Sequence, residues 1–264
     1  MRKLLLFCAV TLLTGCAHLR PQPFTFVQMC DPQLGMGGYE ADVARFKQAV
    51  KQINALKPDL VVICGDLVNK PDAKSYADFN AIKAGFTVPC YCAPGNHDVA
   101  NAPTPKTLRF YRASVGKDYY EFEHKGCAFV VANTSLWKAP VAGESEQHDA
   151  WFKEALQKAA RKHEPIFVIS HYPLFVKHPG ETNGYYNLPV EKRQELLELF
   201  ERCGVVAHVA GHTHRTITND FHGIQIVTSQ TTSRNFDQQP FGFRIWRVAG
   251  TRPFRQEFVP LAGQ

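Results

Sequence analysis

The chain of 264 residues lacks the features that divide or disorder a polypeptide. It has no internal repeat, no low-complexity block and no Ser/Gly-rich linker, so we expect one folded domain. Charged residues make up only 20% of the sequence and hydrophobic residues 45%, which excludes an intrinsically disordered protein. No run of lysine or arginine is present and the net charge is +6, so no nucleic-acid partner is indicated.

The sequence also lacks a hydrophobic run that could cross a bilayer. Its N-terminal apolar stretch has about ten residues, roughly half of what a membrane-spanning helix needs. Arg2 and Lys3 precede this stretch, and Leu13-Thr14-Gly15-Cys16 closes it. The pattern resembles a bacterial lipoprotein signal peptide. A simple secretory signal, with a cysteine near its end by chance, is the alternative.

The lipoprotein resemblance implies a location and an anchor. Residues 1–15 would be removed as the signal peptide, Cys16 would carry the lipid, and residues 16–23 would form a short tether. The protein would then be exported and attached to a bacterial envelope membrane. In a Gram-negative cell, that would be the outer membrane, with the protein facing the periplasm.

The cysteines of the expected domain, residues 24–262, lack the spacing of a zinc site. Cys90-x-Cys92 has no matching second pair. Most of the others lie in or beside apolar runs, where a thiol behaves as a small buried hydrophobe. We therefore expect mostly free, buried thiols, although an exported protein could pair them. The six are Cys30, Cys64, Cys90, Cys92, Cys127 and Cys203.

Five apolar runs typical of buried strands each end at polar residues that could bind a metal. The runs are residues 24–30, 60–64, 88–92, 166–170 and 205–210, followed by Asp31-Pro32-Gln33, Gly65-Asp66, Gly95-Asn96-His97-Asp98, His171 and Gly211-His212-Thr213-His214. Helical patterns over residues 43–56, 147–162 and 190–202 separate the strands, which predicts an α/β layered fold. Groups just past the carboxyl ends of such strands share one crevice, so the five motifs should converge.

The C-terminal part of the chain has a different pattern. Residues 224–229, 241–248 and 254–259 are strand-like, with no helical pattern between them. Strands without intervening helices are typical of antiparallel pairing. We therefore expect these segments to form a second, antiparallel sheet packed on the first.

The converging motifs contain more ligands than one metal ion needs. Oxygen and imidazole ligands without thiolate suit Mn, Fe, Zn or Ni. Two divalent or trivalent ions that share one carboxylate account for the set better than a single ion, and such a pair attracts phosphate. The pattern suits two-metal phosphoester hydrolysis. The candidate ligands are Asp31, Gln33, Asp66, Asn96, His171, His212 and His214.

In their order along the chain, these blocks resemble the signature of the calcineurin-like metallophosphoesterase superfamily, over about residues 24–260. The resemblance implies a two-sheet β-sandwich flanked by helices, and a dinuclear centre bridged by Asp66. A bridging hydroxide would attack phosphorus in line, and His97 would contact the phosphate and protonate the leaving group. One metal would be held by Asp31, Gln33, Asp66 and His214, the other by Asp66, Asn96, His171 and His212.

Two positions depart from the family pattern. Gln33 stands where the first block usually has histidine, and an amide oxygen is a weaker donor than imidazole. A branch of the superfamily that includes an animal single-domain protein Ser/Thr phosphatase resembles this chain in having Asp-Pro-Gln. Asn69 stands where phosphoprotein phosphatases often have an aspartate that orients the catalytic histidine. Gly-Asp-x-x-Tyr, the purple acid phosphatase signature, is absent.

Residues outside the candidate ligand set receive less specific expectations. Three residues are candidates for supporting the centre or touching substrate: Asn69, Asp98 and Arg215. Arg215 is preferred because arginine binds phosphate and because this residue directly follows His214. Further substrate candidates lie on the expected loops 99–118, 172–189 and 230–241: Arg109, Arg112, Tyr185, Tyr186, Arg234 and Asn235. His208 lies in an apolar run and is expected in the core, and Tyr119 and Tyr120 are expected to pack. Surface positions are expected for His124, His148, His163, His178 and His222.

Three functions fit this sequence. A metal-dependent phosphomonoesterase acting on a phosphorylated substrate of unspecified class is the first. The second is a phosphodiesterase with the same centre, acting on a nucleotide or a lipid headgroup. The third is a non-catalytic binding module on the same fold. We expect a monomer in each case.

Overall fold

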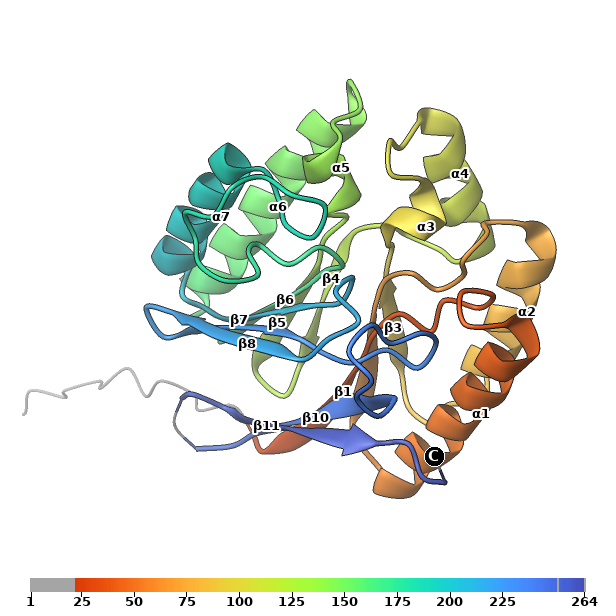
Figure 1. Ribbon diagram of the computed structural model, residues 1–264. Helices are drawn as coiled ribbons and strands as arrows, with labels where there is room; N and C mark the ends of the chain where they lie inside the picture. Colours follow the sequence, from red (N-terminus) through yellow and green to blue (C-terminus); the bar gives the residue numbers. More distant parts are fainter. Residues whose placement is uncertain (1–21, 251, 264) are drawn as a thin grey trace, which may run out of the picture.

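The computed structural model describes residues 22–250 and 252–263 as two face-to-face β-sheets with helices on their outer faces (Figure 1). The first sheet has the order β11 (Arg255–Pro260), β10 (Gly242–Val248), β1 (Phe24–Met29), β2 (Leu60–Cys64) and β3 (Cys90–Ala93). The second has the order β4 (Tyr120–His124), β5 (Cys127–Val131), β6 (Ile166–Ile169), β7 (Val205–Ala210), β9 (Ile224–Thr228) and β8 (Ile217–Phe221). This is the predicted α/β sandwich, and the predicted signal peptide and Cys16 lie outside the described residues.

Both sheets are mixed. β1, β2 and β3 are parallel, whereas β10 and β11 pair antiparallel on the other side of β1. In the second sheet β5, β6, β7 and β9 are parallel, and the antiparallel strands β4 and β8 form its edges. The prediction that the C-terminal strands form a sheet of their own is therefore wrong. β9 extends the second sheet and β10 the first, because each sheet leaves an edge that one of these strands covers.

Helices cover the outer face of each sheet. α1 (Tyr39–Leu56) and α2 (Ala73–Lys83) pack on the first sheet, and α6 (Glu144–Arg161) and α7 (Val190–Cys203) on the second (Figure 1). α1, α6 and α7 contain the three predicted helices. The short helices α3 (Asn96–Val99), α4 (Pro105–Ser114) and α5 (Ser135–Lys138) follow β3 and β5. The expected loop 99–118 therefore contains a helix.

A core rich in aromatic rings fills the space between the sheets. Phe26 of β1 stacks on Trp246 of β10 with centroids 5.5 Å apart, and meets Phe129 and Phe167 of the second sheet edge-on at 5.4 and 5.2 Å. All four rings are completely buried. The large aromatic area removed from water favours the pairing of the two sheets.

One buried polar side chain also links the two sheets. Gln28 of β1 donates from Nε2 to the carbonyl oxygens of Ala210 (3.0 Å) and Val227 (3.2 Å), and its Oε1 accepts from Trp246 Nε1 (3.0 Å). Ala210 is the last residue of β7. Because buried amides need partners, these bonds fix how the end of β7 sits over β1.

Two further findings concern the described residues. The cysteines of the domain are all free, five of them buried and Cys90 partly buried, in agreement with the prediction. Within residues 22–250 and 252–263, none of the helices has both the length and the apolar character needed to span a bilayer.

Candidate metal centre

The five predicted motifs meet at one end of the sandwich. Each follows the carboxyl end of a strand: β1, β2 and β3 of the first sheet, and β6 and β7 of the second. Because the two sheets face each other, residues almost the whole domain apart in sequence become neighbours. His212 donates its backbone N–H to both carboxylate oxygens of Asp31 at 3.1 Å.

The gathered side chains form two groups of ligand type that share Asp66. One contains Asp66, His171 and His212, the other Asp31, Asp66 and His214, and the potential ligand atoms of each lie within 4.8 Å of one another. The side chains of all five residues are at most 4% exposed. Asn96 joins the first group through its Oδ1, 2.9 Å from His171 Nε2. These groups correspond to the division between two ions that the family resemblance implies.

Each of the three histidines is held by a backbone carbonyl. Nδ1 of His171 lies 2.8 Å from the oxygen of Cys64, Nε2 of His212 lies 3.2 Å from that of Tyr185, and Nδ1 of His214 bonds to that of Arg234. A carbonyl only accepts, so each of these nitrogens carries the hydrogen. In the neutral rings, the opposite nitrogen is left with its lone pair for a metal ion.

Two further observations show that the residues fit a metal. His212 Nδ1 and His171 Nε2 are 3.1 Å apart; when both rings are neutral their lone pairs face each other at that distance, and a shared proton or a cation between them removes the repulsion. Oε1 of Gln33 is buried and has no hydrogen-bond partner, although its Nε2 donates to Asn69 Oδ1 at 3.4 Å. A buried orphan oxygen is costly unless it coordinates something.

His97 is the half-buried member of the motif set. Its Nδ1 donates to the backbone oxygen of Asn69 at 3.1 Å, and its backbone N–H donates to Asp66 Oδ1 at 2.9 Å. Asn69 stands where related phosphatases often orient this ring with an aspartate side chain, and here its backbone oxygen holds the ring. Asp98 accepts backbone N–H groups of Leu67 (3.0 Å) and Gly95 (2.7 Å), and thus ties two of the motifs together.

The backbone is strained at five of the ligand candidates. Positive φ angles are found at Asp31 (48°), Gln33 (33°), Asp66 (49°), His212 (68°) and His214 (52°). This left-handed region is unfavourable for residues other than glycine. Such strain persists only where the surroundings enforce it, and it is typical of functional sites.

Two glycines beside the centre are required by close approach. A Cβ at Gly95 would lie 2.1 Å from Asp66 Oδ1, and one at Gly211 would lie 2.6 Å from the oxygen of Cys64 and 2.8 Å from Asp31 Oδ2. These glycines therefore make room for the candidate ligand carboxylates.

Burial and neighbouring charges shift the pKa values of the carboxylates and histidines of the centre in different directions. Burial raises the pKa of Asp31 far above its usual value. At Asp66 burial is also the largest cause, but the interactions with His171, His97 and His212 together outweigh it and the pKa falls. Although burial opposes it, the two carboxylates raise the pKa of His171 to about 9. Burial lowers the pKa of His212 and of His214, so both rings are neutral at pH 7.

The arginines and the asparagine that were predicted to touch substrate lie in different surroundings. Arg109 and Arg112 lie on α4, and Arg112 is ion-paired with Asp118 and Glu144. Arg215 and Arg234 are exposed beside His214, and Arg215 Nη2 lies 3.4 Å from the oxygen of Phe236. Asn235 is partly buried and bonds to the oxygen of Gln239.

Some contacts of the centre were missed by sequence reasoning. The carbonyls of Cys64, Tyr185 and Arg234 leave no side-chain signal, because every residue has this group. Phe236 stacks on His214 with ring centroids 4.9 Å apart. A single aromatic residue within the polar stretch 234–239 was the available signal for it.

The predictions for the remaining histidines were mostly confirmed. His208 is fully buried and bonds to Ser170 Oγ at 2.7 Å, while Tyr119 and Tyr120 pack as expected. His163, His178 and His222 are exposed, and His124 is half-buried. The surface prediction for His148 is wrong: it is completely buried among aromatic rings, because the apolar face of α6 extends to its first turn.

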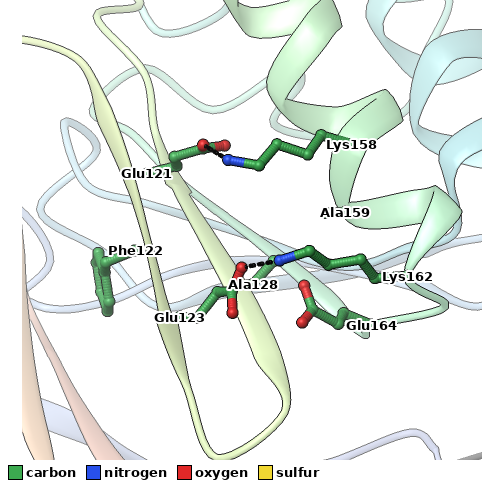
Figure 2. Close-up of a pocket in the computed structure, with 8 residues that line it drawn as sticks. All are labelled: Glu121, Phe122, Glu123, Ala128, Lys158, Ala159, Lys162 and Glu164. Carbon is green, nitrogen blue, oxygen red and sulfur yellow. Dashed lines mark hydrogen bonds and ion pairs between the residues drawn. The ribbon is translucent and has the colours of Figure 1, made fainter.

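A groove elsewhere on the molecule carries none of the motif residues. It lies between β4 and α6, where Figure 2 shows Lys158 paired with Glu121 and Lys162 paired with Glu123. Both lysines are about half exposed, and ion pairs in such exposed positions contribute little to stability. We assign no chemistry to this groove.

Known proteins share this sequence pattern and fold. The calcineurin-like phosphoesterase family matches residues 10–216. The chain is 32% identical to the serine/threonine-protein phosphatase CPPED1 of Danio rerio over 250 residues, covering 84% of this chain and 80% of that protein. It is 29% identical to a probable glycerophosphodiester phosphodiesterase GpdQ of Arcobacter nitrofigilis over 197 residues, covering 70% and 67%.

A solved structure shares the fold. The crystal structure of a dimetal phosphatase from Danio rerio superposes with a TM-score of 0.65 at 16% identity, covering 90% of this chain and 99% of that one. The chain belongs to the calcineurin-like phosphoesterase family. It is therefore a phosphoester hydrolase, and the ligand groups around Asp66 support divalent metal cofactors. The third function, a non-catalytic binding module, is not favoured by these relatives.

Proposed function

We propose that this calcineurin-like phosphoesterase is a phosphomonoesterase with two metal ions. The observation that supports the two-metal centre is the pair of ligand groups that share Asp66, in which all three histidines are fixed by backbone carbonyls. One ion would be held by Asp31, Gln33, Asp66 and His214, and the other by Asp66, Asn96, His171 and His212. Mn, Fe, Zn and Ni all suit these donors.

When bound, the two ions would supply an activated nucleophile and balance the charge of the phosphate. The chain's own residues supply orientation and a proton. His97 is half-buried, whereas the ligand candidates are buried, so it is the member of the set within reach of a bound ester. Its Nδ1 is held by the Asn69 carbonyl, which directs Nε2 away from that carbonyl as the proton donor for the leaving oxygen.

The preference for monoesters is supported by the relatives. Both fish and human CPPED1 are named serine/threonine-protein phosphatases, and the human protein is 30% identical over 249 residues. The rival activity, phosphodiester hydrolysis, is favoured by the likeness to the probable diesterase GpdQ, which covers less of the chain. Rates on matched mono- and diester substrates separate these two activities.

The N-terminal sequence supports a proposal about location. We infer that a lipid on Cys16 anchors a monomeric enzyme to a bacterial envelope membrane, where it acts on extracytoplasmic phosphate esters. A change of Cys16→Ser should release the protein from membranes in cell fractions, with the native chain sedimenting with them. Recovery of the native chain in the soluble fraction would contradict the anchor, and light scattering on detergent-extracted protein tests the monomer.

Metal analysis combined with a phosphoester panel tests the activity. Asp66→Ala should lose both metal and turnover, because Asp66 belongs to both ligand groups. His97→Ala should retain metal but lose about a hundredfold or more in kcat, the usual contribution of a general acid. Full activity of His97→Ala would remove it from the mechanism. Faster turnover of diesters than of monoesters by the native protein would reverse the choice between the two activities.

A further inference from the structure

Exposed aromatic side chains are concentrated at the metal centre. Tyr185 is 53% exposed, Tyr186 43% and Phe236 41%. Among the described residues, only two other large hydrophobic side chains, Leu56 and Phe110, are exposed. Exposed apolar surface gathered in one place is typical of a binding site rather than of chance.

These rings lie directly on the imidazoles of the centre. The ring centroids of Tyr185 and Tyr186 are 4.8 and 5.6 Å from that of His212. Phe236 stacks on His214 at 4.9 Å with an interplanar angle of 27°, and the guanidinium of Arg234 lies 5.8 Å from the Phe236 centroid. A substrate whose phosphate reaches these histidines therefore has aromatic surface beside it.

The loop that carries the two tyrosines is held in place. Arg193, completely buried on α7, donates to the oxygens of Pro179 (2.6 Å), Glu181 (2.8 Å) and Leu188 (2.8 Å). The carboxylate of Glu181 accepts from the backbone N–H of Val176 at 2.8 Å. Rings on a fixed loop lose little freedom when a ligand stacks on them, which favours binding.

We propose that Tyr185, Tyr186 and Phe236 form a stacking surface for a planar aromatic group that lies next to the scissile phosphate. The proposal rests on the proposed function and names its substrate class: phosphomonoesters that carry an aromatic ring. Two sources have this chemistry, a phenyl-type ring as in phosphotyrosine and a nucleobase as in a nucleoside monophosphate. Both stack on aromatic side chains with little demand for hydrogen bonds.

The test compares substrates that differ in the ring but not in the leaving group. Benzyl phosphate is paired with propyl phosphate, and adenosine 5′-monophosphate with ribose 5-phosphate, because each pair releases an alkoxide of similar basicity. With the metal-loaded full chain, kcat/KM should favour the aromatic member of at least one pair by about tenfold or more. The pair with the larger ratio identifies the source of the ring.

Variants of the stacking surface then test the residues. In Tyr185→Leu and Phe236→Leu the aromatic-to-aliphatic ratio should fall several-fold, whereas Phe236→Trp should keep it. Phe110→Leu, which removes an exposed ring from α4, is the matched control and should leave the ratio unchanged. Thermal melting of each variant confirms folding. Ratios near one in the native protein, or ratios that the leucine variants leave unaltered, would overturn the proposal.

A binding measurement separates this proposal from the proposed function. Benzylphosphonate and propylphosphonate are not hydrolysed, so their Kd values measured by calorimetry do not depend on turnover. Tighter binding of benzylphosphonate to a protein that hydrolyses no ester would support the stacking surface while overturning the phosphatase assignment. Rapid turnover with equal Kd values for the two phosphonates would do the reverse.

Discussion

Asn69 serves the centre through two different atoms. Its backbone oxygen accepts from His97, and its side-chain oxygen accepts from Gln33 Nε2, which leaves Gln33 Oε1 free for a metal ion. The two departures from the family pattern are therefore one linked feature. An amide at position 33 has a donor as well as an acceptor, and the acceptor at position 69 decides which of them faces the centre.

This link makes a prediction for metal binding. Asn69→Leu should weaken metal binding by about 10–100-fold, because the Gln33 amide loses the partner that orients it. Asn69→Asp keeps the acceptor and should bind at least as tightly as the native protein. Competition with a chelating dye measures both. Unaltered affinity in Asn69→Leu would mean that Gln33 needs no such support.

His148 is a buried base that the structure keeps neutral. Burial lowers its pKa to about 4, from a usual value of 6.5, and the carboxylate of Asp149 at 3.9 Å does not compensate. Its Nε2 accepts from the backbone N–H of Asn133 at 3.2 Å. The unfolded chain therefore binds a proton between pH 6.5 and 4 that the folded chain does not.

Acid should accordingly destabilise the fold through this residue. Above pH 6.5 this titration does not affect the free energy of unfolding. As the pH falls from 6.5 toward 4, the free energy of unfolding decreases by about 3 kcal/mol. His148→Gln keeps an acceptor for Asn133 but does not titrate, so its unfolding free energy in urea should fall less over this range. The exposed His178→Gln is the control and should follow the native curve. Parallel curves for His148→Gln and the native protein would contradict the assignment.

At the scale of elements, the turn between β3 and α3 places the carboxylate of Asp66, which both ligand groups share. Gly95 lies against Asp66 so closely that even a methyl group has no room. Gly95→Ala should therefore displace Asp66, cost about 1–3 kcal/mol of stability and abolish metal binding. Gly180→Ala is a matched control, since the nearest atom would be 3.8 Å away. Denaturant titration and metal analysis measure both effects, and normal metal content in Gly95→Ala would refute this role.

The sequence predicts elements where one periodic face is buried. Phe46, Val50 and Ile53 of α1 recur every three or four residues and are all buried. In α2 the buried residues Tyr76, Phe79 and Ile82 are few, and the helix start is marked mainly by Asp72, which accepts from Ser75 N at 2.8 Å. Short helices with so little periodicity are hard to predict.

The same reasoning explains which parts of the centre were predictable. Asp66 and His212 follow buried strands, and strand ends meet, so their convergence follows from the pattern. Their left-handed backbone and the carbonyl of Tyr185 depend on tertiary structure, which no residue type encodes. The placement of β9 and β10 also depends on which sheet edge is free, and local sequence does not contain that information.

For the whole molecule, a bound metal centre would link the two sheets. Asp31 and Asp66 come from the first sheet, and His171, His212 and His214 from the second. Metal that binds only this assembled state stabilises it by about 2.7 kcal/mol at a hundred times Kd. A chelator should therefore lower Tm by roughly 5–10 °C for a chain of this size. Scanning fluorimetry measures the shift, and an equal shift in Asp66→Ala would show that the chelator acts elsewhere.

The carbonyls that hold His212 and His214 come from the loops that carry the stacking rings. What each imidazole requires from its loop is a peptide oxygen, and every amino acid provides one. The side chains at positions 185, 186 and 236 can therefore change while the candidate metal ligands stay in place. Natural or laboratory evolution could alter what this catalyst recognises without rebuilding how it reacts.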